Sequence, residues 1–195
     1  IRECLRAVLD QAPCPCDFEV LVLDNASTDD TRAILAEFQG IRSFLLPTNL
    51  GFAQANNFAA TRARGDCLAL LNQDAVPHRA WLSELVQGLR EYPEYAALQS
   101  NQILPWNEEF EVTAREAFPR NLYCFRIAEQ GYAEQRTQPL PPQGLLETNF
   151  ISGAACLIRK SALKDQTLFH PSIDHYCEDL ELSLRLQRQN QKMGT

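Results

Sequence analysis

The sequence contains no uninterrupted apolar stretch long enough to cross a bilayer, and no signal-peptide pattern opens it. These two absences argue against a membrane span. Basic residues are also in the minority, because 18 Lys and Arg side chains stand against 25 Asp and Glu and leave a net charge of −7. Broad nucleic-acid binding requires a basic face that neutralises phosphates, so no nucleic-acid partner is expected.

Several signature motifs are absent as well. There is no G-x-G-x-x-G dinucleotide fingerprint, no G-x-x-x-x-G-K-[ST] phosphate loop and no G-x-S-x-G elbow. The only close cysteine pair, Cys14 and Cys16, lacks the two-residue spacer of zinc sites. The seven cysteines are odd in number and scattered, which favours a reducing, cytoplasmic compartment over a disulfide framework.

What is present is the composition of a globular protein. Hydrophobic residues make up 45% of the chain and charged residues 22%. A chain of 195 residues suits a single domain and buries roughly 70% of the surface that its unfolded form exposes. We therefore expect one domain over residues 1–195, with a hydrophobic core that needs no structural metal.

Two kinds of segment alternate over the first two-thirds of the chain. Val20–Leu23 is a short apolar run, and Thr31–Phe38 carries apolar residues at helical spacing before Gly40. The same alternation predicts further strands at 41–46, 67–71 and 96–98, and further helices at 52–63 and 81–89.

The strands indicate the fold class. Val20–Leu23 and Leu68–Leu71 are apolar at every position, as expected for strands covered by helices on both faces. Strands and helices that alternate with short connections form right-handed crossovers and a parallel sheet. We predict an α/β fold in three layers, with a mainly parallel sheet flanked by helices.

The remaining segments are less regular. Residues 105–148 break the alternation, and we interpret them as a variable insertion or lid, because a structureless loop of that length is unusual without a role. Regular structure is expected to resume with Ala154–Ile158. Leu180–Leu186 is predicted to be a helix, since Leu, Glu, Arg and Gln favour helices although the leucines alternate.

The predicted helix Arg2–Gln11 starts without a cap or a preceding strand, and Lys192–Thr195 ends abruptly, so we expect a domain truncated at both ends.

Polar residues follow each of the first three strands. These clusters are Asp24-Asn25, Thr48-Asn49 and Asn72-Gln73-Asp74. Any one of them could be an ordinary turn or helix cap. All three together favour a ligand site, because ligands of open α/β sheets bind outside the carboxyl ends of the strands. Carboxylates and amides suit a divalent cation with a sugar or nucleotide, and Asp74 would be a hard ligand for Mg²⁺ or Mn²⁺.

An ordered set of motifs resembles the family 2 glycosyltransferases of the GT-A fold, most closely their rhamnosyltransferase-like branch. The set begins with Val22–Asp29 (VLDNASTD), continues with Asn49–Ala53 (NLGFA) and Asn56-Asn57, and reaches Leu71–Asp74 (LNQD). It continues with Trp81-Leu82, Ser152–Ala154 (SGA) and Glu178–Leu182 (EDLEL). The resemblance covers nearly the whole chain.

The resemblance also implies roles for individual residues. Asp24 with Asn25 would contact the nucleotide, and Asn49, Gly51 and Asn57 would form the wall beside it. Asn72-Gln73-Asp74 occupies the position of the family's Asp-x-Asp motif, with Asp74 as the metal ligand. Asp179 would be the catalytic base, Glu178 its neighbour and runner-up, and Ser152, Gly153 and Ala154 would line the acceptor side. The family's usual first strand, which lies in the middle of the sheet, is expected to be missing ahead of residue 2.

The implied activity is inverting transfer of a sugar from a nucleotide-diphospho-sugar to an acceptor hydroxyl, in the synthesis of bacterial surface polysaccharide. A lipid-linked glycan acceptor would bring this cytoplasmic protein to the inner face of the cell membrane as a peripheral protein. Two alternatives stay open at this stage. They are a non-catalytic binding module of the same architecture and a sugar nucleotidyltransferase.

Overall fold

The computed structural model describes residues 1–102, 121–127, 133–139, 144–164, 167–173 and 176–195. The helices among them are α1 (Arg2–Leu9), α2 (Thr31–Ala36), α3 (Gly51–Ala60), α4 (Trp81–Glu91), α6 (Glu178–Arg188) and the short 3₁₀ helix η1 (Lys160–Leu163). The strands are β1 (Val20–Asp24), β2 (Ile41–Leu45), β3 (Cys67–Leu71), β4 (Tyr95–Gln99), β5 (Asn121–Ile127), β6 (Ala133–Pro139), β7 (Glu147–Thr148), β8 (Ala155–Arg159) and β9 (Lys192–Gly194).

The strands form a mixed set of sheets. β1 and β2 pair in parallel, as predicted from the alternation of strands and helices. A second sheet has the order β3-β8-β4-β9-β7, in which β8 runs antiparallel to both β3 and β4, and β9 runs parallel to β4. β3, β4 and β9 therefore share one direction.

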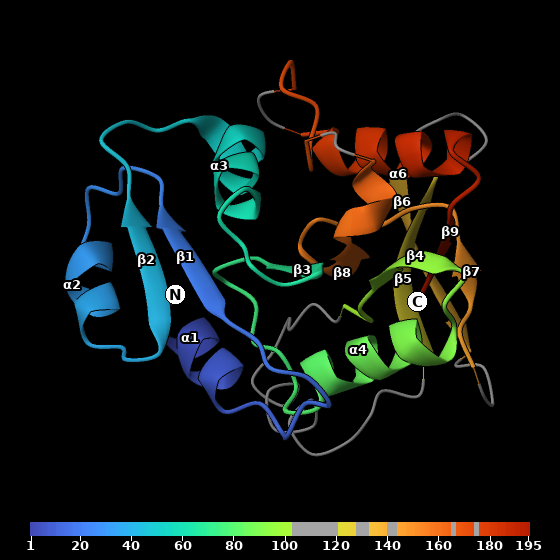
Figure 1. Ribbon diagram of the computed structural model, residues 1–195, viewed down its shortest axis with the longest axis horizontal. Helices are drawn as coiled ribbons and strands as arrows, with labels where there is room; N and C mark the ends of the chain where they lie inside the picture. The colour runs from blue at the N-terminus through green and yellow to red at the C-terminus, as the bar shows by residue number, and fades with distance from the viewer. Residues whose placement is uncertain (103–120, 128–132, 140–143, 165–166, 174–175) are drawn as a thin grey trace.

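Helices cover both faces of the larger sheet, which confirms the three-layer α/β prediction. Neighbouring residues of β8 point to opposite sides: Cys156 and Ile158 belong to one apolar cluster and Leu157 to another. The first cluster is closed by α3, α6 and η1, and the second by α4. In Figure 1, α3 and α6 accordingly lie above the strands and α4 lies below them.

The helix boundaries follow from local sequence. α4 buries Leu82, Leu85 and Leu89 at helical spacing and ends just before Pro93, whose ring disfavours helical backbone in the preceding residue. α6 places Glu178, Asp179 and Glu181 in its first turn and basic residues in its last, which suits the helix dipole. The predicted helix at 180–186 is confirmed.

The structure adds elements that the apolar pattern did not predict. β5 and β6 form an antiparallel hairpin within the segment 105–148, and β7 pairs antiparallel with β9. Regular structure thus returns before Ala154, and residues Lys192–Gly194 form a strand. The interpretation of 105–148 as a variable insertion or lid stays a prediction, since much of it lies outside the described residues.

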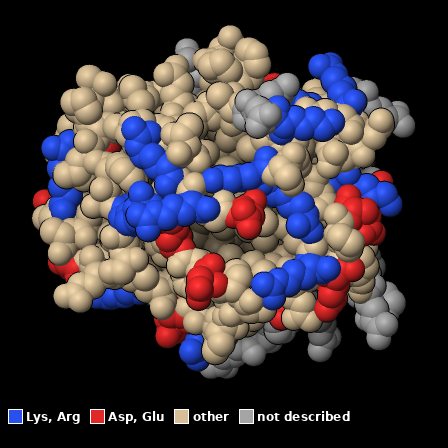
Figure 2. All heavy atoms as spheres, in the orientation of Figure 1, with Lys and Arg blue, Asp and Glu red and all other residues tan. Residues whose placement is uncertain are grey.

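Within the described residues, every helix is too short or too polar to span a membrane. On the face shown in Figure 2, acidic and basic side chains are interspersed among the described residues.

Candidate functional site

The carboxylate of Asp24 lies buried at the carboxyl end of β1. Its side chain has no exposed area and accepts hydrogen bonds from the backbone N–H of Ser27 (2.9 Å) and from Nε of Arg32 (2.8 Å). Burial raises the pKa of Asp24, but these hydrogen bonds and the Arg32 charge outweigh that effect and hold the pKa below its ordinary value. The carboxylate therefore fixes the turn after β1.

Asn25 and Asn49 join the ends of β1 and β2 to the start of α3. Nδ2 of Asn25 donates to Oδ1 of Asn49 (2.8 Å), and Oδ1 of Asn25 accepts from the backbone N–H of Leu50 (2.8 Å). Oδ1 of Asn49 also accepts from the N–H of Gly51, which has φ +76° and so occupies a conformation that glycine adopts without strain. Two of the predicted polar clusters thus meet, as the shared sheet edge requires.

The third cluster meets the Ser152–Ala154 motif. The backbone N–H of Asn72 donates to the carbonyl oxygen of Ala154 (2.9 Å), which extends the β3–β8 pairing by one bond. Ser152 is buried and accepts from the N–H of Ala154 (3.3 Å). Asp74, two residues beyond Asn72, is exposed. The structure therefore places an accessible carboxylate two residues beyond the point where the chain contacts the turn that leads into β8.

Asp179, in the first turn of α6, reaches the same turn. Its Oδ2 accepts from the N–H of Gly153 (3.4 Å), and its Oδ1 accepts from the N–H of Leu180 (2.8 Å). Burial raises the pKa of Asp179 above its ordinary value, and the N–H groups of Gly153 and Leu180 oppose that rise. A carboxyl with a raised pKa is better matched to taking up a proton near neutral pH. Glu178, its predicted runner-up, is the first residue of the same helix.

Two aromatic rings connect these pieces. A side chain added at Gly153 would lie 3.6 Å from the ring of Phe169, 3.8 Å from the ring of Phe52 and 3.7 Å from Cβ of Asp179. Phe52 follows Gly51 at the start of α3, and its ring centroid is 5.8 Å from that of Phe169. The start of α3, the turn before β8 and the start of α6 therefore form one contiguous region.

Asn57, predicted to line a nucleotide, uses its carboxamide within the fold. Nδ2 donates to the carbonyl oxygen of Phe169, and Oδ1 accepts from the N–H of the same residue, both at 2.8 Å. Arg185 of α6 holds the neighbouring carbonyl of Leu168 (2.7 Å). Sequence reasoning did not identify Phe169 or Arg185, since neither lies in a recognisable motif.

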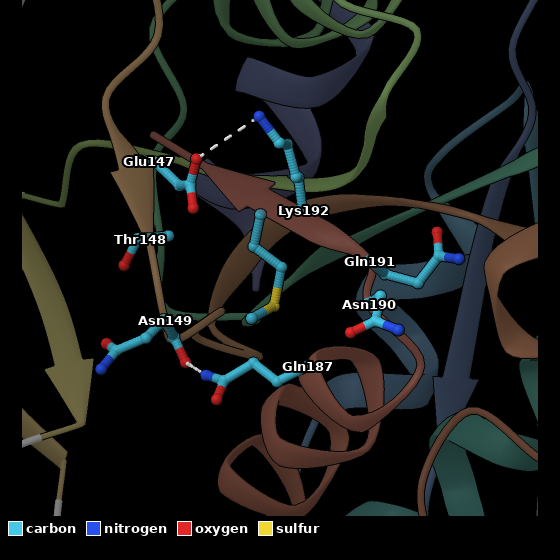
Figure 3. Close-up of a pocket in the computed structure, with 8 residues that line it drawn as sticks. Glu147, Thr148, Asn149, Gln187, Asn190, Gln191 and Lys192 are labelled. Atoms are coloured by element: carbon cyan, nitrogen blue, oxygen red, sulfur yellow. Dashed lines mark hydrogen bonds and ion pairs between the residues drawn. The ribbon is translucent and has the colours of Figure 1, made fainter.

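The site residues that the resemblance implies do not line either of two cavities that the structure contains, although Leu180 and Glu181 of the EDLEL motif line the second. A cavity of about 330 Å³ lies at the opposite end of α6, between β7, β9 and the helix, and carboxamide side chains line it together with the Glu147–Lys192 ion pair (Figure 3). A second, of about 290 Å³, lies beside the exposed side of α6 around Leu180 and Leu184.

Within the described residues, no three His, Cys, Asp or Glu side chains gather to hold a metal ion. Any metal at Asp74 would therefore depend on further ligands, such as the substrate's phosphates.

Comparison with known proteins gives consistent matches. The model of the family described as glycosyl transferase family 2 matches residues 1–167. The O-antigen biosynthesis protein RfbC of Myxococcus xanthus is 28% identical over 204 residues, which cover 97% of this chain and 15% of that protein. Glycosyltransferase AglE of Haloferax volcanii is 34% identical over 86 residues, or 42% of this chain and 28% of that protein. The chain spans between 15% and 30% of the length of the curated relatives it matches.

Solved structures show the fold. The crystal structure of GalNAc-T7 with UDP, GalNAc and Mn²⁺ matches with a TM-score of 0.73 and 16% identity. The match covers 97% of this chain and 38% of the GalNAc-T7 chain. The mannosyltransferase PcManGT from Pyrobaculum calidifontis, in complex with GDP-Man and Mn²⁺, matches 99% of this chain and 49% of its own, with a TM-score of 0.68 and 19% identity. The predicted GT-A fold is thereby confirmed.

Proposed function

The chain belongs to glycosyl transferase family 2, and on that premise we propose that its site transfers a sugar from a nucleotide-diphospho-sugar donor to an acceptor hydroxyl, with inversion at the anomeric carbon. The observation that carries the proposal is the position of Asp179. Its partly buried carboxyl, with a raised pKa, accepts from the N–H of Gly153, in the turn whose Ala154 carbonyl accepts from the N–H of Asn72. A carboxylate so placed suits a general base for the attacking hydroxyl.

In this proposal each group has a separate task. Asp179 removes the proton from the acceptor hydroxyl as that oxygen attacks the anomeric carbon, and Glu178 is the runner-up for this role. The turn at Ser152–Ala154 lines the acceptor side. The network of Asn25, Asn49 and Gly51 shapes the nucleotide side, and the buried Asp24 holds the backbone from which that network starts.

We assign the divalent cation to Asp74. An exposed carboxylate is a hard oxygen ligand, and Mg²⁺ or Mn²⁺ commonly binds through one or two carboxylates together with substrate phosphates. A cation held there would supply positive charge to the leaving diphosphate. Asn72, at the first position of the Asp-x-Asp motif, supplies an amide instead of a second charge. The Mn²⁺ in the structures of two fold neighbours supports this assignment.

The relatives support a substrate class for this proposal. Two of them are described as acting in O-antigen and teichuronic acid biosynthesis, which supports a bacterial surface polysaccharide as the product. A glycan or lipid-linked glycan would then be the acceptor, and a lipid-linked one would bring this cytoplasmic protein to the inner membrane face. Membership of the rhamnosyltransferase-like branch stays a prediction.

The test is turnover of a donor panel by the full chain. UDP-, GDP- and dTDP-sugars are incubated with Mn²⁺, and release of the nucleoside diphosphate is measured. We expect one donor to be turned over, and Asp179→Asn to lower that rate by roughly 10²–10⁴-fold while the donor still binds. Glu84→Gln, an exposed acid on α4, is the matched control. Equal rates in Asp179→Asn and the parent, or a full loss only in Glu178→Gln, would remove Asp179 from the role of base.

A further inference from the structure

Asn57 is bound to a single residue 112 positions away in the sequence. Its carboxamide donates to the carbonyl oxygen of Phe169 and accepts from the N–H of Phe169, each over 2.8 Å. A carboxamide that pairs with both backbone groups of one residue fixes that residue in position and in orientation. These two bonds occupy one donor and one acceptor of the four that a carboxamide offers.

The segment that Asn57 holds is anchored from the opposite side by the helix of the proposed base. Arg185 of α6 donates to the carbonyl oxygens of Leu168 (2.7 Å) and Thr167 (3.2 Å) and pairs with Glu181. Residues 167–169 therefore bridge α3 and α6. Phe169 has no exposed area, so its ring has no room to move away from its neighbours.

The ring of Phe169 in turn determines where Gly153 lies. It stands 3.6 Å from the position that a side chain at Gly153 would take, and the ring of Phe52 stands 3.8 Å from it. The N–H of Gly153 is the group that donates to Oδ2 of Asp179. A shift of Phe169 would therefore move the donor that holds one oxygen of the Asp179 carboxylate.

We infer that Asn57 is a positioning residue for Asp179, acting through Phe169 and Gly153, rather than a residue that contacts the nucleotide. The inference rests on the proposed function, because it concerns the residue that is proposed as the base. The contacts themselves exist whether or not the chain transfers sugar. Several ionisable groups lie on the elements around the carboxyl. They are Cys156 and Arg159 on β8, Glu178, Glu181, Arg185 and Arg188 on α6, His170 at the end of the bridging segment and Asp74 after β3. α3 carries no ionisable side chain, so replacing Asn57 by Ala changes no charge.

The test measures the Asp179 carboxyl directly. In the full chain with ¹³C-labelled aspartate, the Asp179 carboxyl signal is assigned with Asp179→Asn and followed against pH. In Asn57→Ala the Gly153 N–H is held less firmly, and because that N–H lowers the pKa of Asp179, we expect the pKa to rise. Gln54→Ala is the matched control, since Gln54 is an exposed residue of the same helix, and it leaves the Asp179 pKa unchanged.

A second variant and a kinetic measurement complete the experiment. If Asn57→Ala does not fold, Phe169→Leu removes the ring behind Gly153 and takes its place in the titration. With the donor found active in the panel, Asn57→Ala is expected to lower kcat by about 10- to 100-fold with an unchanged KM for the donor, as a small misplacement of a catalytic group does. A folded Asn57→Ala whose Asp179 titrates as in the parent overturns the inference. A shifted titration in a chain that turns over no donor would instead contradict only the proposed function.

Discussion

At the scale of single residues, the three aspartates of the site differ in what surrounds them. Asp24 is buried and charged, Asp179 is partly buried with a raised pKa, and Asp74 is exposed. The same residue type therefore holds the backbone of a turn at position 24, is the proposed base at position 179 and is the proposed metal ligand at position 74. Their positions after strands made Asp24 and Asp74 candidates for one cleft, and the family resemblance added Asp179. Burial and hydrogen bonding separate the three.

Replacing Asp24 by Asn should destabilise the fold in a way that depends on pH. The carboxylate accepts two hydrogen bonds, one from the charged Arg32, and losing such a bond costs about 1.5–3 kcal/mol. Because the pKa of Asp24 is lowered on folding, its contribution is present above the unfolded pKa and is lost as pH falls through the folded one. Urea unfolding should therefore show a difference between Asp24→Asn and the parent at pH 7 that shrinks in acid. The control is Asp30→Asn, at an exposed helix cap whose side chain makes no capping hydrogen bond. A difference between Asp24→Asn and the parent that is equal at every pH would contradict this account.

The activity should also depend on the ionisation of Asp179. A base acts only when deprotonated, and burial raises the pKa of this carboxyl. The acidic limb of kcat/KM, which reports the free enzyme, should therefore have its midpoint above the usual aspartate pKa of about 3.9. The measurement is the rate of nucleoside diphosphate release against pH. A midpoint at or below the usual value would show that Asp179 does not control that limb.

At the scale of elements, the first 100 residues were predictable because their apolar residues follow simple periods. The strand at 20–24 and the helices at 31–36, 51–60 and 81–91 all lie within a few residues of the predicted ranges. β7 and β9 were not predictable, since strands of two and three residues are too short to show a period. β8 was predicted as an apolar run, but its antiparallel direction depends on contacts with β3 and β4 that no local pattern records.

Packing between α4 and β4 gives a prediction at this scale. A Cβ at Gly88 would lie 2.8 Å from Cδ1 of Leu98, whose side chain is buried. Overpacking costs about 1–3 kcal/mol, while replacing glycine by alanine within a helix gains about 1 kcal/mol. Gly88→Ala should therefore lower the free energy of unfolding by up to about 2 kcal/mol, measured in urea.

The matched control for Gly88 lies next to it on the same helix. Gln87 is exposed, so Gln87→Ala should stay within about 0.5 kcal/mol of the parent. A Gly88→Ala variant more stable than the parent would show that Leu98 moves aside at little cost and that the contact between α4 and β4 is looser than described.

At the scale of the whole molecule, the convergence of distant segments was predicted, and its details were not. The rule that strand ends share one edge of a sheet correctly placed Asn25 beside Asn49. It did not indicate that Asn57 would pair with Phe169, because residues 167–169 contain no recognised motif and their position depends on α3 and α6 together. Nor did it indicate that Asp24 would be sealed from solvent by Ser27 and Arg32.

The central claim is that these segments form a site for a nucleotide and a divalent cation at Asp74. Isothermal titration of the full chain with UDP, GDP and dTDP, with and without Mn²⁺, tests it most directly. The account predicts that one of these nucleotides binds, that Mn²⁺ tightens its binding, and that Asp74→Asn removes the effect of Mn²⁺ while Asp17→Asn, an exposed acid outside the motifs, does not. A folded chain that binds none of the three nucleotides in the presence of Mn²⁺ would contradict the account and favour a non-catalytic module.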